Sequence, residues 1–258
     1  MEFTVFTKPW KLEIPALAKH VAGLGFDGIE LPVRPGFPVN PANQAKALPA
    51  AARVLADHGL KIRSVAGSID EASVAACAES GVPLVRVCAS LEPGEHYDAG
   101  VTRLRRWLED AVPHLERFGV AVGVQNHCGR DVCHATGIRD LVAPFDPSHV
   151  GLVWDAAHNA LQGEEPELAL DIVWDRLRLV NLKNAYWERI NGPEAECALW
   201  RPYWTGGRYG LASWPRVMAS LQARGYEGPV CLTAEYSDES GVDRLIAEDL
   251  AFAKGLLA

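Results

Sequence analysis

Asp155 and His158 are a carboxylate and an imidazole placed where a buried run of residues ends. Asp155 directly follows the apolar run Val150–Trp154, and His158 comes three residues later. A carboxylate accepts hydrogen bonds and an imidazole exchanges a proton near neutral pH, so the pair suits acid–base chemistry. There is also a structural alternative, in which Asp155 caps the helix that follows and His158 belongs to its first turn.

Other apolar runs of the chain also end in polar or aromatic side chains. These are Thr7, Lys8 and Trp10; Glu30 and Arg34; Glu92 and His96; Gln125, Asn126 and His127; Asn181, Lys183 and Asn184; and Glu235 and Tyr236. A lone polar residue at a strand end is usually structural. Because the carboxyl ends of the strands of a parallel barrel meet at one face, so many of them predict a shared pocket.

The elements that must position these groups alternate along the chain. Helical patterns end in a glycine, as at Gly25 and Gly119, and an apolar run follows. The predicted strands are Glu2–Thr7, Gly28–Leu31, Lys61–Ala66, Leu84–Ala89, Val120–Gln125, Val150–Trp154, Leu177–Leu182 and Val230–Ala234. The predicted helices are Glu13–Leu24, Pro41–His58, Asp70–Ser80, Ala99–Phe118, Thr136–Val142, Pro166–Asp175, Ser213–Arg224 and Val242–Leu256.

This alternation predicts an α/β protein, one (β/α)8 TIM barrel domain over residues 1–258, rather than an open doubly wound sheet. No G-x-G-x-x-G or Walker loop follows the first strand, so we expect no nucleotide cofactor. Asn40 before Pro41 and the pattern Ser68-x-x-Glu71 predict two helix starts. Asn184–Ala212 is predicted to be a long, aromatic-rich loop over the pocket.

Composition limits the partners. The net charge of -8 argues against a nucleic-acid binder, and no apolar run is long enough to span a bilayer. The N-terminal residues show no signal-peptide pattern, and the six cysteines form no C-x-x-C pair, so we expect reduced thiols in a cytoplasmic protein. The sequence leaves open whether the chain forms a homo-oligomer.

Several segments, taken in order, resemble motifs of the xylose-isomerase-like TIM-barrel superfamily. They are GFDGIEL, QNHCG, DAAH, VNLKN, and GGRYGLASW followed by RGYEGPVCLTAE. The resemblance spans nearly the whole chain. It implies a carbohydrate isomerase or epimerase, or a lyase such as a dehydratase, acting on a sugar or keto-sugar. The DNA-repair nucleases of the same superfamily need more histidine ligands than this acidic chain offers.

The resemblance also implies a metal site. One divalent metal is commonly held in that family by Glu, Asp, His and Glu, and the matching positions here are Gln125, Asp155, Asn181 and Glu235. Two of the four are amides. Carboxylate and amide oxygens suit Mg²⁺ or Mn²⁺ better than zinc. The sequence leaves open whether a metal binds.

The catalytic roles follow from the same resemblance. The related epimerases move a proton with two glutamates, matched here by Gln125 and Glu235, and Gln125 cannot act as a base. One-base chemistry is therefore favoured, with Glu235 as the base if its surroundings raise its pKa. We expect His127 or Lys183 to act as the acid and His158 to orient a substrate hydroxyl. The alternative is a non-catalytic sugar-binding barrel that has lost its metal site.

Substrate contacts are expected from aromatic, amide and charged side chains at the strand ends and in the long loop. Such a lining suits a small polyhydroxylated molecule. The candidates are Trp10, Glu30, Arg34, Asn126, Trp187, Trp204 and Arg208. Trp174 and Trp214 are instead predicted to pack between helices.

Overall fold

Eight parallel strands close into a barrel in the computed structural model, which describes residues 1–257. The strands are β1 (Glu2–Phe6), β2 (Gly28–Pro32), β3 (Lys61–Ala66), β4 (Leu84–Cys88), β5 (Ala121–Gln125), β6 (Val150–Asp155), β7 (Leu177–Leu182) and β10 (Pro229–Leu232). They pair in chain order, and β10 closes the barrel between β7 and β1. All eight predicted strands are present, with ends shifted by at most two residues. The predicted barrel is confirmed.

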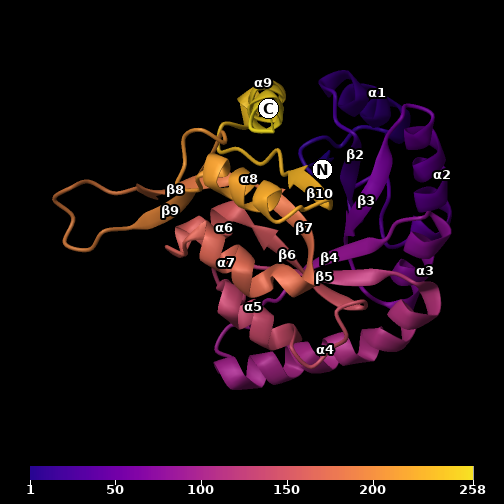
Figure 1. Cartoon of the computed structure of the whole chain (residues 1–258), viewed down its shortest axis with the longest axis horizontal. Helices are drawn as coiled ribbons and strands as arrows, with labels where there is room; N and C mark the ends of the chain where they lie inside the picture. Colours follow the sequence, from indigo (N-terminus) through magenta and orange to yellow (C-terminus); the bar gives the residue numbers. More distant parts are fainter. Residues whose placement is uncertain (258) are drawn as a thin grey trace.

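Helices surround the barrel (Figure 1). They are α1 (Ile14–Leu24), α2 (Gln44–Ala56), α3 (Glu71–Glu79), α4 (Tyr97–Phe118), α5 (Ala135–Val142), α6 (Ala156–Leu161), α7 (Pro166–Val173), α8 (Trp214–Ala223) and α9 (Val242–Gly255), with 3₁₀ turns at Trp174–Arg176 and Glu239–Gly241. The short α6, directly after β6, was not predicted. Among residues 1–257, no helix has the length and apolar character needed to cross a membrane.

The capping box predicted from Ser68 and Glu71 is wrong. Asp70 is the residue before α3, and its carboxylate accepts a hydrogen bond from Ser73 N at 2.9 Å. Ser68 Oγ accepts instead from Asp70 N at 3.3 Å. A carboxylate at this position serves the same purpose, because it satisfies a free N–H of the first helical turn.

The predicted start of the second helix at Pro41 is also wrong. α2 begins at Gln44, because residues 41–43 form a turn. Asn40 Oδ1 accepts from Ala42 N at 3.1 Å, the local bond by which asparagine side chains stabilise turns.

The barrel interior is filled by one apolar side chain from each of six strands. These are Phe6, Ala66, Leu84, Val153, Leu179 and Cys231. A Cβ at Gly123 would lie 2.7 Å from Val153 Cγ2, so glycine on β5 makes room for this packing. The larger core lies between strands and helices, where Trp214 is buried and stacks on Phe252. Trp214 packs as predicted.

The predicted long loop is wrong in part, because it contains an antiparallel hairpin. β8 (Asn184–Arg189) pairs with β9 (Trp200–Thr205), and Figure 1 shows the hairpin projecting from the barrel body. The cross-strand pair Tyr186 and Tyr203 stacks at 5.1 Å between ring centroids, a contact that stabilises antiparallel pairs. The hairpin leaves β7 at its carboxyl end and therefore reaches the expected site.

Asp249 on α9 ties the segment after this hairpin to the barrel. Its carboxylate accepts hydrogen bonds from Gly207 N at 2.7 Å and from the Tyr236 hydroxyl at 2.8 Å. Burial is the main cause that raises the pKa of Asp249 to about 6. The folded pKa of Asp249 exceeds its unfolded value, so the neutral carboxyl group is favoured by folding. Its contribution to the free energy of unfolding is present below about pH 4 and is lost as pH rises through about 6, where the buried group must ionise.

We therefore expect Asp249→Asn to change the pH dependence of folding. The amide keeps an acceptor for Gly207 and carries no charge, so it avoids a cost of roughly 2–3 kcal/mol above pH 6. Urea unfolding at several pH values between about 4 and 8 should show the free energy of unfolding of the variant increasing relative to that of the wild type as pH rises. Two parallel stability curves would contradict the assignment.

Candidate active site

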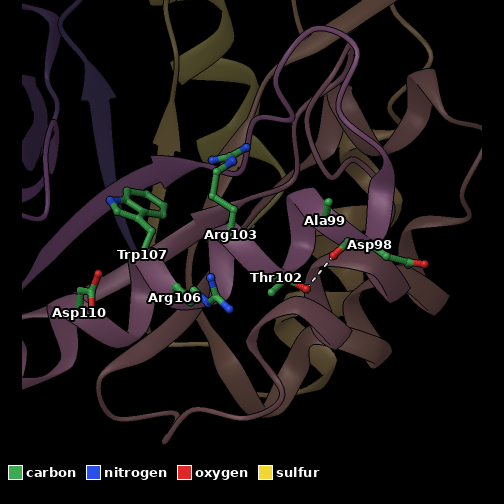
Figure 2. Close-up of a pocket in the computed structure, with 7 residues that line it drawn as sticks. All are labelled: Asp98, Ala99, Thr102, Arg103, Arg106, Trp107 and Asp110. Carbon is green, nitrogen blue, oxygen red and sulfur yellow. Dashed lines mark hydrogen bonds between the residues drawn. The ribbon is translucent and has the colours of Figure 1, made fainter.

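A cavity of about 720 Å³ opens at the carboxyl ends of the barrel strands. Its walls include Lys8, Trp10, Trp204, Glu235, Glu239 and Asp243. A second depression, of about 640 Å³, lies elsewhere and is shown in Figure 2. All of its lining residues come from α4, and none is a predicted site residue. A single helix face offers no convergent groups, so the strand-end cavity is the candidate site.

Glu235 follows β10 and lies between two lysines. Its Oε2 accepts a hydrogen bond from Lys183 Nζ at 2.7 Å, and its Oε1 accepts from Lys8 Nζ. The preceding Ala234 has φ of 53°, an uncommon left-handed conformation that aims Glu235 into the site. Burial favours the neutral acid, but the two ammonium charges outweigh it and lower the pKa of Glu235 to about 2. The raised pKa expected of a base is absent.

Trp204 on β9 lies between the ion pair of Glu235 with Lys183 and the histidines. The Lys183 ammonium lies 3.6 Å from the centre of the Trp204 ring, a cation–π contact. The same ring packs edge-to-face with His158, with centroids 5.2 Å apart. Lys183 is nearly buried, so its charge acts in a site of low dielectric.

His127 and His158 stack with centroids 4.0 Å apart, and their hydrogen bonds assign them opposite tautomers. His127 Nδ1 lies 2.7 Å from Asp131 Oδ2 and 2.9 Å from Cys128 O. Both partners are acceptors, so Nδ1 carries the proton. Nε2 then holds a free lone pair, and no described residue hydrogen-bonds to it. His127 can therefore accept a proton at Nε2.

His158 has the reverse arrangement. The backbone N–H of Cys128 donates to His158 Nδ1 at 3.2 Å, so the proton of the neutral ring is on Nε2. Burial, aided by the charge of Lys183, holds the pKa of His158 well below its usual value. The ring is therefore neutral and offers an N–H donor. A proton acceptor and a proton donor thus lie side by side.

Asp131 fixes the orientation of His127. Besides binding His127, its carboxylate accepts a hydrogen bond from the Ser90 hydroxyl at Oδ1. Burial alone would raise the pKa of Asp131, but these hydrogen bonds lower it below its usual range. The group is therefore a carboxylate that holds the imidazole ring in place.

A buried chain of polar bonds runs beneath the pocket. Arg86 on β4 binds Glu30 through Nε at 2.8 Å and Nη2 at 2.6 Å, and donates through Nη1 to Gln125 Oε1. Gln125 Nε2 then donates to Asp155 Oδ2 at 2.9 Å. The amide is thus oriented by a donor on one side and an acceptor on the other.

Asp155 has the structural role described above as the alternative. It is the N-cap of α6, and its Oδ1 accepts from Ala157 N at 3.0 Å and His158 N at 3.1 Å. Asn126 bonds both backbone groups of Asp155, through Oδ1 at 2.7 Å and Nδ2 at 3.2 Å. Asp155 and Asn126 therefore hold the loop ends in place.

The four positions matched to metal ligands do not fit a divalent cation. Gln125, Asp155 and Glu235 direct their oxygens at donors of the chain itself. Asn181 Oδ1 is buried and, within residues 1–257, has no partner, but it is a single neutral oxygen. Hard cations need several free oxygens that converge on one point.

A second group of metal-binding side chains, His127, Cys128 and His158, has ligand atoms within 4.8 Å of one another. A histidine that binds a metal usually donates its other ring N–H to an acceptor. His158 Nδ1 does the opposite, because it accepts from Cys128 N. Burial also raises the pKa of the Cys128 thiol, which disfavours the thiolate that metals require. This group suits proton transfer better than metal binding.

Of the other residues predicted to contact substrate, some line the cavity and others do not. Trp10 lines the cavity with its Nε1 bonded to Asp243 Oδ1 at 2.8 Å. Arg34 is exposed and lines a neighbouring pocket of about 360 Å³. Trp187 is turned away and donates to Leu161 O at 3.0 Å.

His127, His158 and Lys183 do not line the cavity themselves; they adjoin it behind Trp204 and Glu235, which do. Two further candidates for substrate contact lie away from it. Arg208 stacks on Phe252 at 3.8 Å, in a separate depression on α9. Glu30 is fully buried under Arg86 and cannot reach a ligand in this structure.

Sequence reasoning missed Asp131, Arg86 and Lys8 as members of the site. Arg86 did give a signal, since it is a charged residue within the apolar strand Leu84–Cys88. Lys8 was noted at the end of β1 but received no role. Asp131 gave no sequence signal, because its pairing with His127 depends on the fold of the loop after β5.

A family model described as xylose isomerase-like TIM barrel matches residues 18–256. An inosose dehydratase from Lacticaseibacillus casei is 22% identical over 138 residues, which cover 52% of this chain and 46% of that protein. The chain thus matches about half the length of this curated relative.

Solved structures show the same architecture. A xylose isomerase domain protein from Planctomyces limnophilus has a TM-score of 0.76 at 16% identity, covering 99% of this chain and 95% of that one. The 3-keto-D-glucoside 4-epimerase from E. coli has a TM-score of 0.75 at 15% identity, covering 99% of both chains. At these identities the likeness establishes a shared fold.

Proposed function

Because the chain belongs to the xylose isomerase-like TIM barrel family, we propose that it is a carbohydrate-active lyase. In this proposal it removes a proton next to the carbonyl of a keto-sugar or cyclic keto-polyol and expels water. The observation that carries the proposal is the pair of stacked histidines with opposite tautomers, close to the Lys183 ammonium. It provides a base, a neutral donor and a positive charge in one place.

The roles follow from the hydrogen bonds. His127 accepts the proton from the carbon next to the carbonyl at Nε2, while Asp131 stabilises the resulting imidazolium. Lys183 supports the negative charge that develops on the carbonyl oxygen, and Glu235 positions Lys183 and Lys8. His158 Nε2–H holds a substrate hydroxyl.

The steps balance with one base. The electron pair of the broken C–H bond moves to the carbonyl oxygen and forms an enolate. The enolate then restores the carbonyl and breaks the C–O bond at the next carbon. The departing hydroxide takes the proton back from His127 and leaves as water, and a carbon–carbon double bond remains.

Three considerations favour elimination over epimerisation. The two-base route needs a second carboxylate at position 125, and Gln125 cannot accept a proton. Glu235, with a pKa of about 2, is a weak base between its two lysines. The inosose dehydratase relative, although only 22% identical, is named for the loss of water.

The test is a panel of keto-sugars and cyclic keto-polyols incubated with the protein in D2O. Proton NMR should show deuterium entering next to the carbonyl of one member, together with an unsaturated product. Catalysis without exchange or water loss would contradict the proposal. If no member reacts while equilibrium dialysis detects binding, a sugar-binding barrel without activity replaces the enzyme.

A further inference from the structure

We propose that Arg86, Lys8 and Lys183 together take the place of the divalent cation that related barrels hold at this end of the sheet. The inference concerns charge and hydrogen bonding in the free protein, so it does not depend on the proposed reaction. Three observations support it: the engagement of the ligand oxygens, the balance of charges, and the orientation of Gln125.

The first observation is that protein donors already occupy the carboxylate oxygens a cation would use, although Asn181 Oδ1 has no partner among residues 1–257. Both oxygens of Glu235 accept from ammonium groups. Asp155 Oδ1 accepts from two backbone N–H groups, and its Oδ2 accepts from Gln125. A cation would have to displace these bonds, and it would approach a site that already contains positive charge.

The second observation is that the nearby charges cancel. The carboxylates are Glu30, Asp155 and Glu235, and the cations are Arg86, Lys8 and Lys183. Arg86 binds Glu30 directly, and the two lysines bind Glu235. A cluster whose charges already balance gains little from a further +2 charge.

The third observation is the fit of the Gln125 amide. Its oxygen accepts from Arg86 and its nitrogen donates to Asp155 at 2.9 Å. A glutamate there would replace the donor with a second carboxylate oxygen, facing Asp155 at hydrogen-bond distance. Such a pair is stable only with a shared proton or a bound cation. Gln125 thus removes the need for a metal that glutamate would create.

The experiment measures metal binding without substrate. The protein is stripped with EDTA, desalted and titrated with MnCl2, with free Mn²⁺ followed by electron paramagnetic resonance. MgCl2 is tested by thermal unfolding, because a ligand that binds only the folded state raises Tm. We expect no saturable binding by the wild type up to about 1 mM metal.

The gain-of-binding variant is Gln125→Glu combined with Lys183→Met. It adds one negative charge and removes one positive charge, and it should bind Mn²⁺ stoichiometrically. Gln222→Glu with Lys46→Met makes the same charge change at exposed positions and should not bind. Circular dichroism checks that each variant folds. If the double variant does not fold, Lys183→Met alone replaces it, with a smaller gain in Mn²⁺ affinity expected.

Stoichiometric binding of Mn²⁺ or Mg²⁺ by the wild type, lost in Asp155→Asn or Glu235→Gln, would overturn the proposal. Failure of the folded variants to bind any better than the wild type would also overturn it. The result stands apart from the proposed function, because an inactive protein and a lyase give the same titration.

Discussion

His127→Asn is expected to slow turnover of the active substrate by about 10²–10⁴-fold, the usual loss when a general base is removed. Asparagine places an amide N–H near the position of Nδ1, so the hydrogen bond to Asp131 can remain. It has no counterpart to Nε2, where the proton is accepted. The measurement is kcat and kcat/KM by steady-state kinetics, with folding checked by thermal unfolding.

Two further variants make this expectation specific. His58→Asn changes an exposed histidine of the α2–β3 segment, remote from the site residues in sequence, and should leave turnover unchanged. Asp131→Asn should lower kcat and also change the imidazole ¹⁵N chemical shifts of His127, because the Nδ1–H group loses the carboxylate that accepts its hydrogen bond. A His127→Asn protein with wild-type kcat would show that another group takes the proton.

Arg86→Met should lower the free energy of unfolding by about 3–5 kcal/mol, the second large effect expected. The substitution leaves Glu30 as a fully buried carboxylate that, within residues 1–257, keeps only Ser64 as a side-chain donor. It also removes the donor to Gln125 Oε1. Urea unfolding at neutral pH measures the loss from the change in midpoint at constant slope.

The matched control is Arg139→Met. Arg139 pairs with Asp175 at 2.9 Å on the surface, so its loss should cost less than about 1 kcal/mol. The double variant Glu30→Gln, Arg86→Met removes both charges and should be more stable than Arg86→Met alone. Equal losses for Arg86→Met and Arg139→Met would contradict a buried, coupled ion pair.

The barrel itself was predictable from local signals. Glycines such as Gly25 and Gly119 end helices with positive φ, and each is followed within a few residues by a strand of the barrel. The hairpin was missed because its strands are joined by about ten residues containing Gly192 and Pro193, rather than by a short turn signal.

The site was predictable as a place but not as a set of bonds. In the structure, Glu235, Lys183 and His158 lie in one region at the strand ends. Which oxygen faces which donor depends on side-chain directions set by the whole barrel. The pairing of Glu235 with two lysines could not be read from residues 8, 183 and 235, which are far apart in the sequence.

The most direct test of the account compares solvent-deuterium exchange in His127→Asn and Glu235→Gln on the same substrate. We predict that His127→Asn loses exchange, whereas Glu235→Gln still exchanges, because Glu235 positions lysines and does not take the proton. Exchange at the wild-type rate by His127→Asn, with none by Glu235→Gln, would contradict the account and return the role of base to Glu235.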